Sequence, residues 1–243
     1  MTLGIYYEHM LAAARQRGTT LPALCAQVRA LGYEAVAPQA AHIVRDAGLL
    51  PMLSSAGLRA EGIYERFLFE SKTQTAQQAA QVLAVCERAG AQYLLAVLPM
   101  LRGGETDRNG ALYARRRDML ATGLETLCAQ AARCGITVLL EPFDSLFSPS
   151  AHAAELLWYF ARVEGLFCAF DTGNPVVCGE ECGKNSADAS ALYPHCACQG
   201  PRFLRQRHAR KANGIGQKGL SGCGRQGGSA ACRHFQKAAA KRL

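Results

Sequence analysis

A glycine recurs at five places in this chain of 243 residues, each time between an amphipathic stretch and a short apolar run. Each glycine suits the left-handed position just past a helix C-terminus, where any side chain would be strained. The runs that follow have the roughly four to eight residues of a buried parallel strand. Successive glycines are separated by the length of one β/α unit: Gly32, Gly57, Gly90, Gly135 and Gly165.

With the opening run at 3–7, the pattern predicts six strands that alternate with helices. The helix before Gly135 has the clearest period, because Leu120, Leu124, Leu127, Cys128 and Ala131 fall on one face. Strands alternating with helices favour a parallel sheet, either open or closed into a barrel. An open nucleotide-binding sheet would have a glycine-rich turn after the first strand, and Tyr6-Tyr7-Glu8-His9 is not one. This favours the barrel.

Charge divides the chain into two parts. Residues 1–181 hold 15 Lys and Arg against 18 Asp and Glu, whereas residues 182–243 hold 12 against one. With net charges of −3 and +11, the two parts of the chain do not look as if they evolved as one protein surface. We therefore expect a partial barrel over 1–181 and a basic tail, rich in Gly and Cys, over 182–243. The tail lacks apolar periodicity, so disorder is its predicted state.

The N-terminus has no basic segment followed by a long apolar stretch, and no later run has the roughly 18 apolar residues of a membrane span. We therefore expect a cytoplasmic protein without a membrane partner. Six cysteines stand singly in the first 181 residues, and in a reducing compartment they are expected to be small core residues. They are Cys25, Cys86, Cys128, Cys134, Cys168 and Cys178.

Acidic residues end two of the predicted strands. Glu141 follows the run 136–140, and Asp171 follows the run 166–170. In a parallel barrel the functional groups gather at the C-terminal ends of strands. A carboxylate directly after a buried strand must be paired or bound to a cation to offset its desolvation, which suggests metal ligands or catalytic groups. A helix N-cap is the alternative role for either residue.

The ordered set Leu-Leu-Glu141-Pro142 and, further on, Phe170-Asp171-Thr172-Gly173-Asn174 resembles the metal-binding pair of the sugar phosphate isomerase/epimerase family, whose members are xylose isomerase-like TIM barrels. The stretches 89–95 and 31–36 are similar to the entries of that family's fourth and second strands. The resemblance covers roughly residues 1–181. It implies an incomplete (β/α)8 barrel of about six β/α units.

The resemblance also implies a divalent metal, Mn²⁺ or Mg²⁺ first and Co²⁺ or Zn²⁺ next. Glu141 would be a ligand and proton carrier and Asp171 a second ligand, while Asn174, His9 and Glu65 would contact the substrate. The reaction would move a proton next to a carbonyl, through an enediolate, in a small sugar, sugar phosphate or hydroxy-keto acid. Asn174 could equally be a turn residue, and His9 and Glu65 could be polar groups on the rim.

The family pattern stops after residue 181. A His-Val-Lys-Asp phrase carrying a ligand His, and an eighth strand with a last Glu, would follow, but neither is present. Back-translation of residues 196–203 with permitted codons, read one base later, gives Ala-His-Val-Lys-Asp-Arg-Asp-Phe. We therefore hypothesise a frameshifted C-terminus. A barrel lacking two strands leaves open sheet edges, so this polypeptide is expected to be inactive, or to be stabilised as a homo-oligomer.

Two other functions stay open. An endonuclease of the same barrel superfamily would need several more His ligands than His9, His42 and His152, and a basic face. A non-catalytic protein could bind nucleic acid through the basic tail, although the tail lacks the interleaved aromatic residues of a dedicated single-strand groove, so specific nucleic-acid binding is not expected.

Overall fold

The computed structural model describes residues 3–169, 174, 178–179 and 202–203. Within them, parallel strands alternate with helices, and the first two β/α units carry two helices each. The strands are β1 (Leu3–Tyr6), β2 (Ala35–Ala37), β3 (Gly62–Arg66), β4 (Tyr93–Val97), β5 (Thr137–Leu140), β6 (Leu166–Cys168) and β7 (Arg202–Phe203). The helices are α1 (Tyr7–Arg17), α2 (Leu21–Ala30), α3 (Ala40–Arg45), α4 (Leu49–Ser55), α5 (Lys72–Ala89), the 3₁₀ helix η1 (Gly103–Thr106), α6 (Ala111–Arg133) and α7 (Ala153–Arg162).

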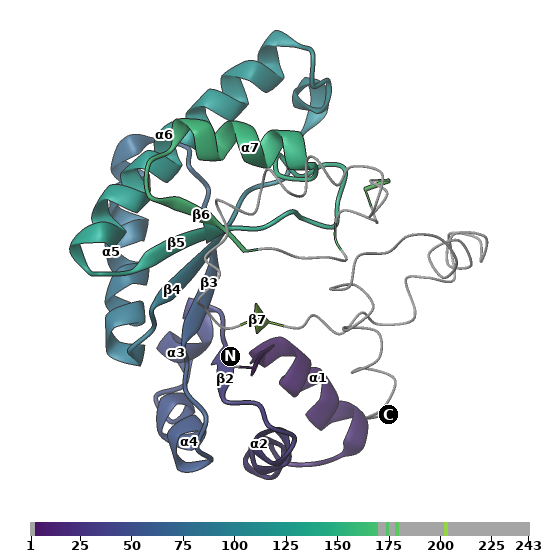
Figure 1. The fold of residues 1–243 in the computed structure, drawn as a ribbon, viewed down its shortest axis with the longest axis vertical. Helices are drawn as coiled ribbons and strands as arrows, with labels where there is room; N and C mark the ends of the chain where they lie inside the picture. Colours follow the sequence, from purple (N-terminus) through teal and green to yellow (C-terminus); the bar gives the residue numbers. More distant parts are fainter. Residues whose placement is uncertain (1–2, 170–173, 175–177, 180–201, 204–243) are drawn as a thin grey trace, which may run out of the picture.

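The strands form one curved parallel array in two hydrogen-bonded sections. One section has the order β2-β1-β7 and the other the order β3-β4-β5-β6. Parallel bridges from Ala35 to Arg59 and from Gln39 to Tyr64 join β2 to the β3 segment. Figure 1 shows the strands at the centre and the helices around the outside. This is the predicted α/β architecture of an incomplete barrel.

The seventh strand differs from the prediction of six. β7 pairs in parallel with β1, and Leu3 and Gly4 face Arg202 and Phe203. It therefore covers, over two residues, the edge of β1 that six strands would leave open. Its position beside the first strand is the one that closes a barrel. The rest of 182–243 lies outside the described residues, so its predicted disorder stays a prediction.

The predicted glycines take the predicted conformation. All five have a positive φ, from 66° at Gly90 to 91° at Gly32. At Gly90 and Gly135 a Cβ atom would meet nothing within 4 Å. Backbone conformation, and not lack of space, is therefore what requires glycine at the ends of α5 and α6.

Side-chain alternation along the strands separates two apolar groups. The larger lies between the sheet and the helices and contains the predicted face of α6, where all five residues are at most 5% exposed. The smaller lies inside the curve of the sheet and consists of buried Tyr6, Ala37, Leu95 and Leu139, with Tyr64, Tyr93 and Ala169 packed on it. Residues of even and odd number on one strand thus have different surroundings.

The six cysteines of the first 181 residues are all free thiols, and Cys134 is the one that is not buried. Burial raises the pKa of Cys86 and of Cys128 to about 12. The prediction of small core residues is confirmed for Cys25, Cys86, Cys128 and Cys168, which belong to the helix-side core, whereas Cys134 is partly buried against it. Among the described residues, no helix is both long and apolar enough to cross a membrane.

We expect Gly90→Ala to destabilise the protein by about 1–2 kcal/mol, because alanine must adopt the left-handed conformation there. Urea unfolding followed by circular dichroism measures the change. Ala89→Gly, one residue earlier and inside α5, is the matched comparison and should cost only about 0.5–1 kcal/mol. A Gly90→Ala variant as stable as the parent would show that φ at this position is not positive in solution.

We expect Cys86 and Cys128 to resist alkylation by iodoacetamide at pH 8. With a pKa of about 12, roughly one thiol in ten thousand is ionised at that pH, against about a quarter of ordinary thiols. Peptide mass spectrometry measures labelling at each site, and labelling in urea provides the reference. Equal rates in the folded and unfolded protein would contradict the burial of these side chains.

Candidate functional site

The C-terminal end of β5 carries a buried carboxylate. Glu141 follows Leu140 directly and is 5% exposed. Leu139 belongs to the inner cluster and Leu140 to the helix-side core, so alternation places Glu141 on the inner side of the sheet. Pairing of Leu140 with Cys168 is extended by a bond from Ala169 N to Leu140 O, 3.0 Å long. The end of β5 is therefore held firmly beside β6.

Asn174 fastens the segment that follows Glu141. Its side chain is 3% exposed, and Nδ2 donates to the carbonyl oxygen of Pro142 at 2.7 Å. Cys178 makes a second link, because Sγ lies 3.3 Å from the carbonyl oxygen of Phe143. The chain beyond β6 thus returns to the residues after Glu141. The bond to Pro142 gives the Asn174 amide a structural role. A contact of Asn174 with substrate or metal stays a prediction.

Asp171, the predicted second ligand, lies outside the described residues. Within the part of the chain that the structure describes, no group of three His, Cys, Asp or Glu side chains is arranged to hold a metal ion. Glu141 is the predicted ligand that can be placed. As an anionic oxygen donor it suits a hard divalent cation such as Mg²⁺.

Glu65 is held at the rim by Gln39, in the segment just after β2, and by its own backbone neighbour. Its Oε1 accepts bonds from Gln39 Nε2 and from the backbone N of Arg66, both 2.9 Å long. Ile63 belongs to the helix-side core and Tyr64 packs on the inner cluster. Alternation therefore places the Glu65 side chain on the helix side of the sheet, away from the inner cluster. This arrangement fits a structural link between β2 and β3, while substrate contact stays a prediction.

His9 lies in the first turn of α1, directly after β1. Its ring contacts the ring of Tyr6 edge-on, with centroids 5.8 Å apart, and Tyr6 meets Tyr64 in the same way at 5.5 Å. The three rings connect the rim to the inner cluster. Aromatic residues therefore line the interior beside the predicted substrate contacts, a feature that the strand-end analysis missed.

Sequence reasoning also missed a pair beside His9. His42 Nε2 on α3 lies 3.0 Å from Glu8 Oε1 on α1. Both oxygens of Glu8 are buried, so the contact offsets part of the desolvation of this carboxylate. Glu8 and His42 are far apart in the sequence and have no common motif that would indicate their pairing.

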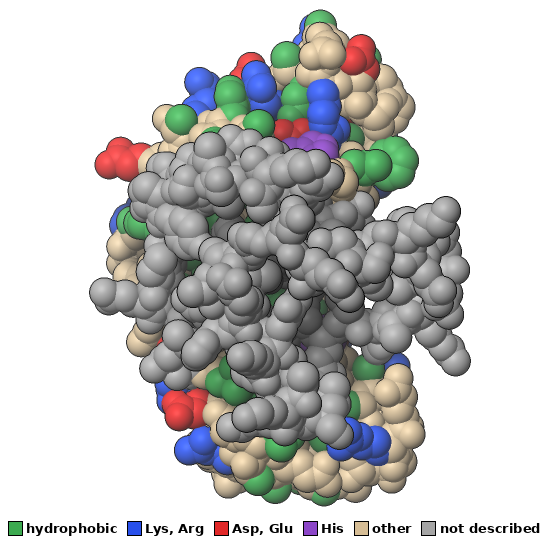
Figure 2. Space-filling view, turned by 45° about the vertical axis from the view of Figure 1, so that its right-hand side comes forward, with side chains coloured by type: hydrophobic (Ala, Val, Ile, Leu, Met, Phe, Trp, Pro, Cys, Tyr) green, Lys and Arg blue, Asp and Glu red, His purple; other side chains and the backbone are tan. Residues whose placement is uncertain are grey.

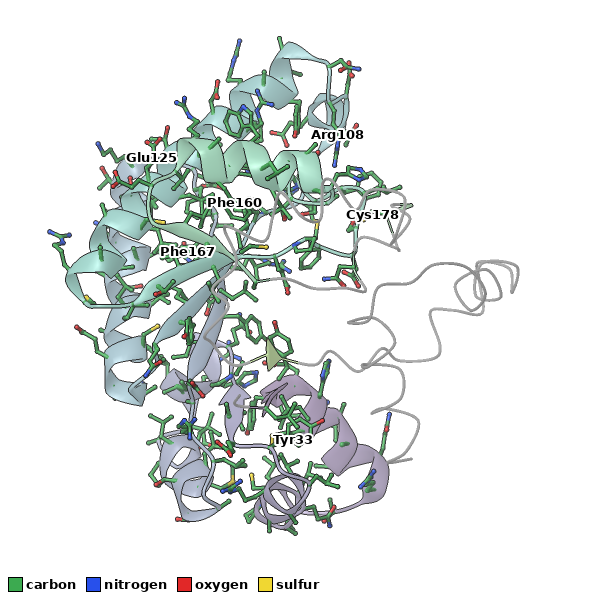
Figure 3. The ribbon with its side chains drawn as sticks, in the orientation of Figure 1. Tyr33, Arg108, Glu125, Phe160, Phe167 and Cys178 are labelled. Carbon is green, nitrogen blue, oxygen red and sulfur yellow. The ribbon has the colours of Figure 1, made fainter. Side chains whose placement is uncertain are left out.

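Arg108 ties together two loops at the same end of the sheet. Its Nη2 donates to the carbonyl oxygens of Leu146, at 3.1 Å, and Ser148, at 2.9 Å. Its Nε lies 2.5 Å from Oε1 of Glu155, in the first turn of α7. Figure 3 shows Arg108 near the end of α7. The loop after β4 is thereby fixed to the loop after Glu141.

The visible described surface mixes both signs of charge. Figure 2 shows Lys and Arg side chains interspersed with Asp and Glu on the described residues, without one large basic area on this face. This distribution agrees with the net charge of −3 counted over residues 1–181.

Three solved structures have similar folds. A sugar phosphate isomerase/epimerase from Parabacteroides distasonis is 8% identical, with a TM-score of 0.62 over 86% of this chain and 87% of that one. A family 2 AP endonuclease from Brucella melitensis is 13% identical, with a TM-score of 0.58 over 75% and 73%. A xylose isomerase-like TIM barrel protein from Mycobacterium smegmatis, in complex with magnesium, is 17% identical, with a TM-score of 0.54 over 72% and 63%.

These similarities establish the fold. The chain has the fold of the xylose isomerase-like TIM barrels, with an incomplete set of strands, and the resemblance found in the sequence is confirmed at that level. No protein-family model matches the chain, and no curated protein matches it. Because isomerases and an endonuclease share this fold, the reaction must be argued from the residues.

We expect Asn174→Ala to destabilise the protein by about 1–3 kcal/mol, because the buried Pro142 carbonyl loses its donor. Asn174→Asp should be at least as harmful, since a carboxylate cannot donate this bond. Urea unfolding of both variants measures the loss. Exposed Asn109, changed to Ala and to Asp, provides the control, and equal midpoints at both positions would show that the Asn174 bond contributes nothing.

Proposed function

We propose that this chain derives from a metal-dependent sugar isomerase or epimerase that acts on a small sugar, sugar phosphate or hydroxy-keto acid. The observation that carries the proposal is the buried carboxylate of Glu141 at the C-terminal end of β5, on the inner side of a barrel-type sheet. This is the end at which parallel barrels place their catalytic groups. The similarity to an isomerase/epimerase fold supports the same reading.

Glu141 and Asp171 are the proposed metal ligands. Two carboxylates favour Mn²⁺ or Mg²⁺, with Co²⁺ or Zn²⁺ as alternatives, and one protein of similar fold carries magnesium. When bound, such an ion polarises the carbonyl and hydroxyl oxygens of a substrate. The anionic side chain of Glu141 gives the buried rim a group that attracts a cation, and the neighbouring bonds of Asn174 and Ala169 fix the backbone on both sides of it.

Glu141 is also the proposed proton carrier. Its carboxylate would take the proton from a carbon next to the substrate carbonyl, and the electron pair of that C–H bond would move to the carbonyl oxygen to give an enediolate. Return of the proton to the former carbonyl carbon, with the proton of the adjacent hydroxyl moving to the former carbonyl oxygen, gives the isomer. Delivery of a proton by a second acid to the opposite face of the original carbon gives the epimer. His9, Glu65 and Asn174 are the proposed substrate contacts around the rim.

The activity of this polypeptide depends on its C-terminal part. The two remaining ligands that the family pattern calls for are absent from the sequence after residue 181. β7 supplies two residues of pairing beside β1. We therefore propose that the chain retains the metal-binding half of the site and little turnover, and that restoring the shifted reading frame restores the rest. A cytoplasmic location and a homo-oligomer belong to the same proposal.

An endonuclease is the alternative, and the similarity to the AP endonuclease of Brucella melitensis is the observation that favours it. Residues 1–181 contain three histidines, and His42 already lies against Glu8. A cluster of several metals would therefore lack ligands. Cleavage of abasic DNA by the frame-restored protein, without sugar exchange, would support this alternative over the isomerase.

The test follows deuterium exchange from heavy water into a panel of ketoses, aldoses and their phosphates, with Mn²⁺, in the frame-restored protein and in the chain as it stands. We expect Glu141→Gln and Asp171→Asn each to lower exchange on the order of 100-fold or more, because both the proton carrier and the metal ligands are affected. Nuclear magnetic resonance of the substrate measures the exchange.

Glu164→Gln is the matched control, because Glu164 is an exposed carboxylate just before β6, at the opposite end of the sheet. Titration with Mn²⁺, followed by electron paramagnetic resonance, separates metal binding from turnover in the same proteins. Exchange that survives in both the Glu141 and the Asp171 variant would reject the assignment, and so would unchanged Mn²⁺ affinity in both.

A further inference from the structure

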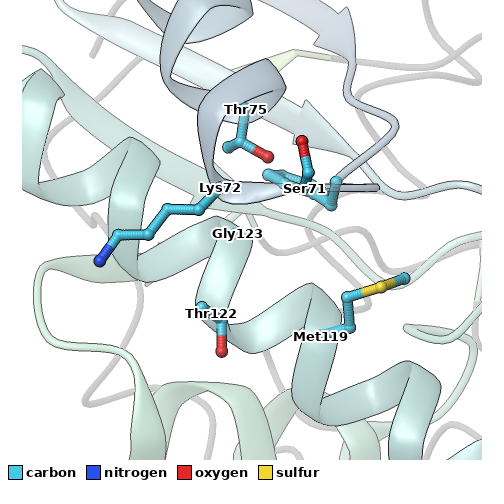
Figure 4. Close-up of a pocket in the computed structure, with 7 residues that line it drawn as sticks. Ser71, Lys72, Thr75, Met119, Thr122 and Gly123 are labelled. Atoms are coloured by element: carbon cyan, nitrogen blue, oxygen red, sulfur yellow. The ribbon is translucent and has the colours of Figure 1, made fainter.

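A surface cavity of about 140 Å³ lies between the N-terminal end of α5 and the middle of α6. Figure 4 shows its walls. One water needs only about 10–15 Å³ of such space, so the cavity has room for a group of several atoms. Its lining comes from the end of the β3–α5 loop and from the two helices: Phe69, Ser71, Lys72, Thr75, Met119, Thr122 and Gly123.

Thr75 places a buried, unsatisfied hydroxyl in this wall. The residue is 2% exposed, and Oγ1 has no hydrogen-bond partner among the described residues. Its backbone N–H is already used, because it donates to Ser71 O at 2.9 Å. A buried hydroxyl without a partner costs free energy, so its position in a cavity wall indicates a polar occupant.

The end of α5 provides further donors at the same place. Ser71 caps the helix by accepting a bond from Gln74 N, at 3.2 Å. The backbone N–H groups of Lys72 and Thr73 precede the first intrahelical donors, and the 18-residue helix directs the positive end of its dipole toward this region. The Lys72 side chain adds a positive charge.

The residues that line the cavity favour one sign of charge in its occupant. Its lining includes one lysine and no acidic residue. The Ser71 hydroxyl donates to Gln74 Oε1 and the Thr122 hydroxyl to Asp118 O, so Thr75 Oγ1 is the lining hydroxyl that still has a donor to offer. A neighbouring cavity shares Thr75 and Phe69 but includes Glu70 and several glutamines, which makes it less suited to an anion. The positive helix end, Lys72 and the Thr75 hydroxyl therefore favour a negatively charged group in the first cavity.

The apolar wall is fixed by two local constraints. Phe69 is the single described residue other than glycine with a positive φ, 52°, and it is 2% exposed. Its ring stacks on Phe67 with centroids 5.3 Å apart, and it lies where a Cβ atom on Gly123 would fall, 2.2 Å from that position. A strained residue persists where its surroundings hold it, and such residues concentrate at ligand sites.

We propose that this cavity binds a small oxyanion, a phosphate or carboxylate group, with Thr75 Oγ1 and the N-terminal end of α5 as its donors and Phe69 as its apolar wall. The site shares no residue with the proposed metal site. Its existence is therefore independent of the proposed isomerase activity.

The test compares Thr75→Val with Thr73→Val in the full chain. Both changes replace a threonine hydroxyl by a methyl group on α5, but Thr73 is exposed and does not line the cavity. Isothermal titration with inorganic phosphate and with acetate distinguishes the two anion types. Thermal unfolding in the same salts, compared with chloride at equal ionic strength, corrects for screening and for the basic tail, which both variants retain.

We expect Thr75→Val to unfold at a higher temperature than the parent without ligand, because a buried unpaired hydroxyl is removed. The same variant should bind the preferred anion on the order of tenfold more weakly or worse, whereas Thr73→Val should bind as the parent does. Lys72→Gln should also weaken binding.

Three results would overturn the proposal. The first is that neither phosphate nor acetate raises the unfolding temperature beyond chloride. The second is that Thr75→Val binds the anion as tightly as the parent. The third is that Thr75→Val unfolds at a lower temperature than the parent without ligand, which would show that the hydroxyl already has a stabilising partner.

Discussion

Side-chain alternation along the parallel strands is the constraint on which the rest of the structure depends. It separates a helix-side core from a small inner cluster rich in tyrosine, and it assigns each residue after a strand to one side or the other. Glu141 falls on the inner side in this way, while Glu65 falls on the side of Ile63. The Glu141 carboxyl group therefore lies on the side of the inner cluster, where we propose that a cation binds, and the Glu65 carboxyl group accepts a bond from Gln39, just after β2.

The general order of the fold could be predicted because its signals are local. A left-handed glycine after each helix and an apolar run after each glycine are visible within a few residues, and Gly90 and Gly135 have the predicted φ. β7 could not be predicted. Arg202 and Phe203 are part of no apolar run, and their pairing depends on β1 offering free backbone groups at the other end of the chain.

Some residues of the candidate site could likewise be found from the sequence, whereas others could not. Glu141 could be found because a charged residue directly after a buried strand is unusual in itself. The Arg108 contacts and the Glu8–His42 pair join loops and helices that meet only in the folded protein, so neither has a sequence signal. Thr75 is a polar residue in the first turn of a helix, like exposed Thr73, and only tertiary packing shows that its hydroxyl is buried.

The pairing of β1 with β7 has a consequence for synthesis on the ribosome. About 200 residues separate Leu3 from Arg202, so the outer edge of β1 stays without its partner until most of the chain has left the exit tunnel. At a typical rate of about 5–20 residues per second, that delay lasts on the order of ten seconds or more. A nascent chain with an unpaired edge for that time is a natural client for chaperones and a template for misassembly with its neighbours on the same polysome.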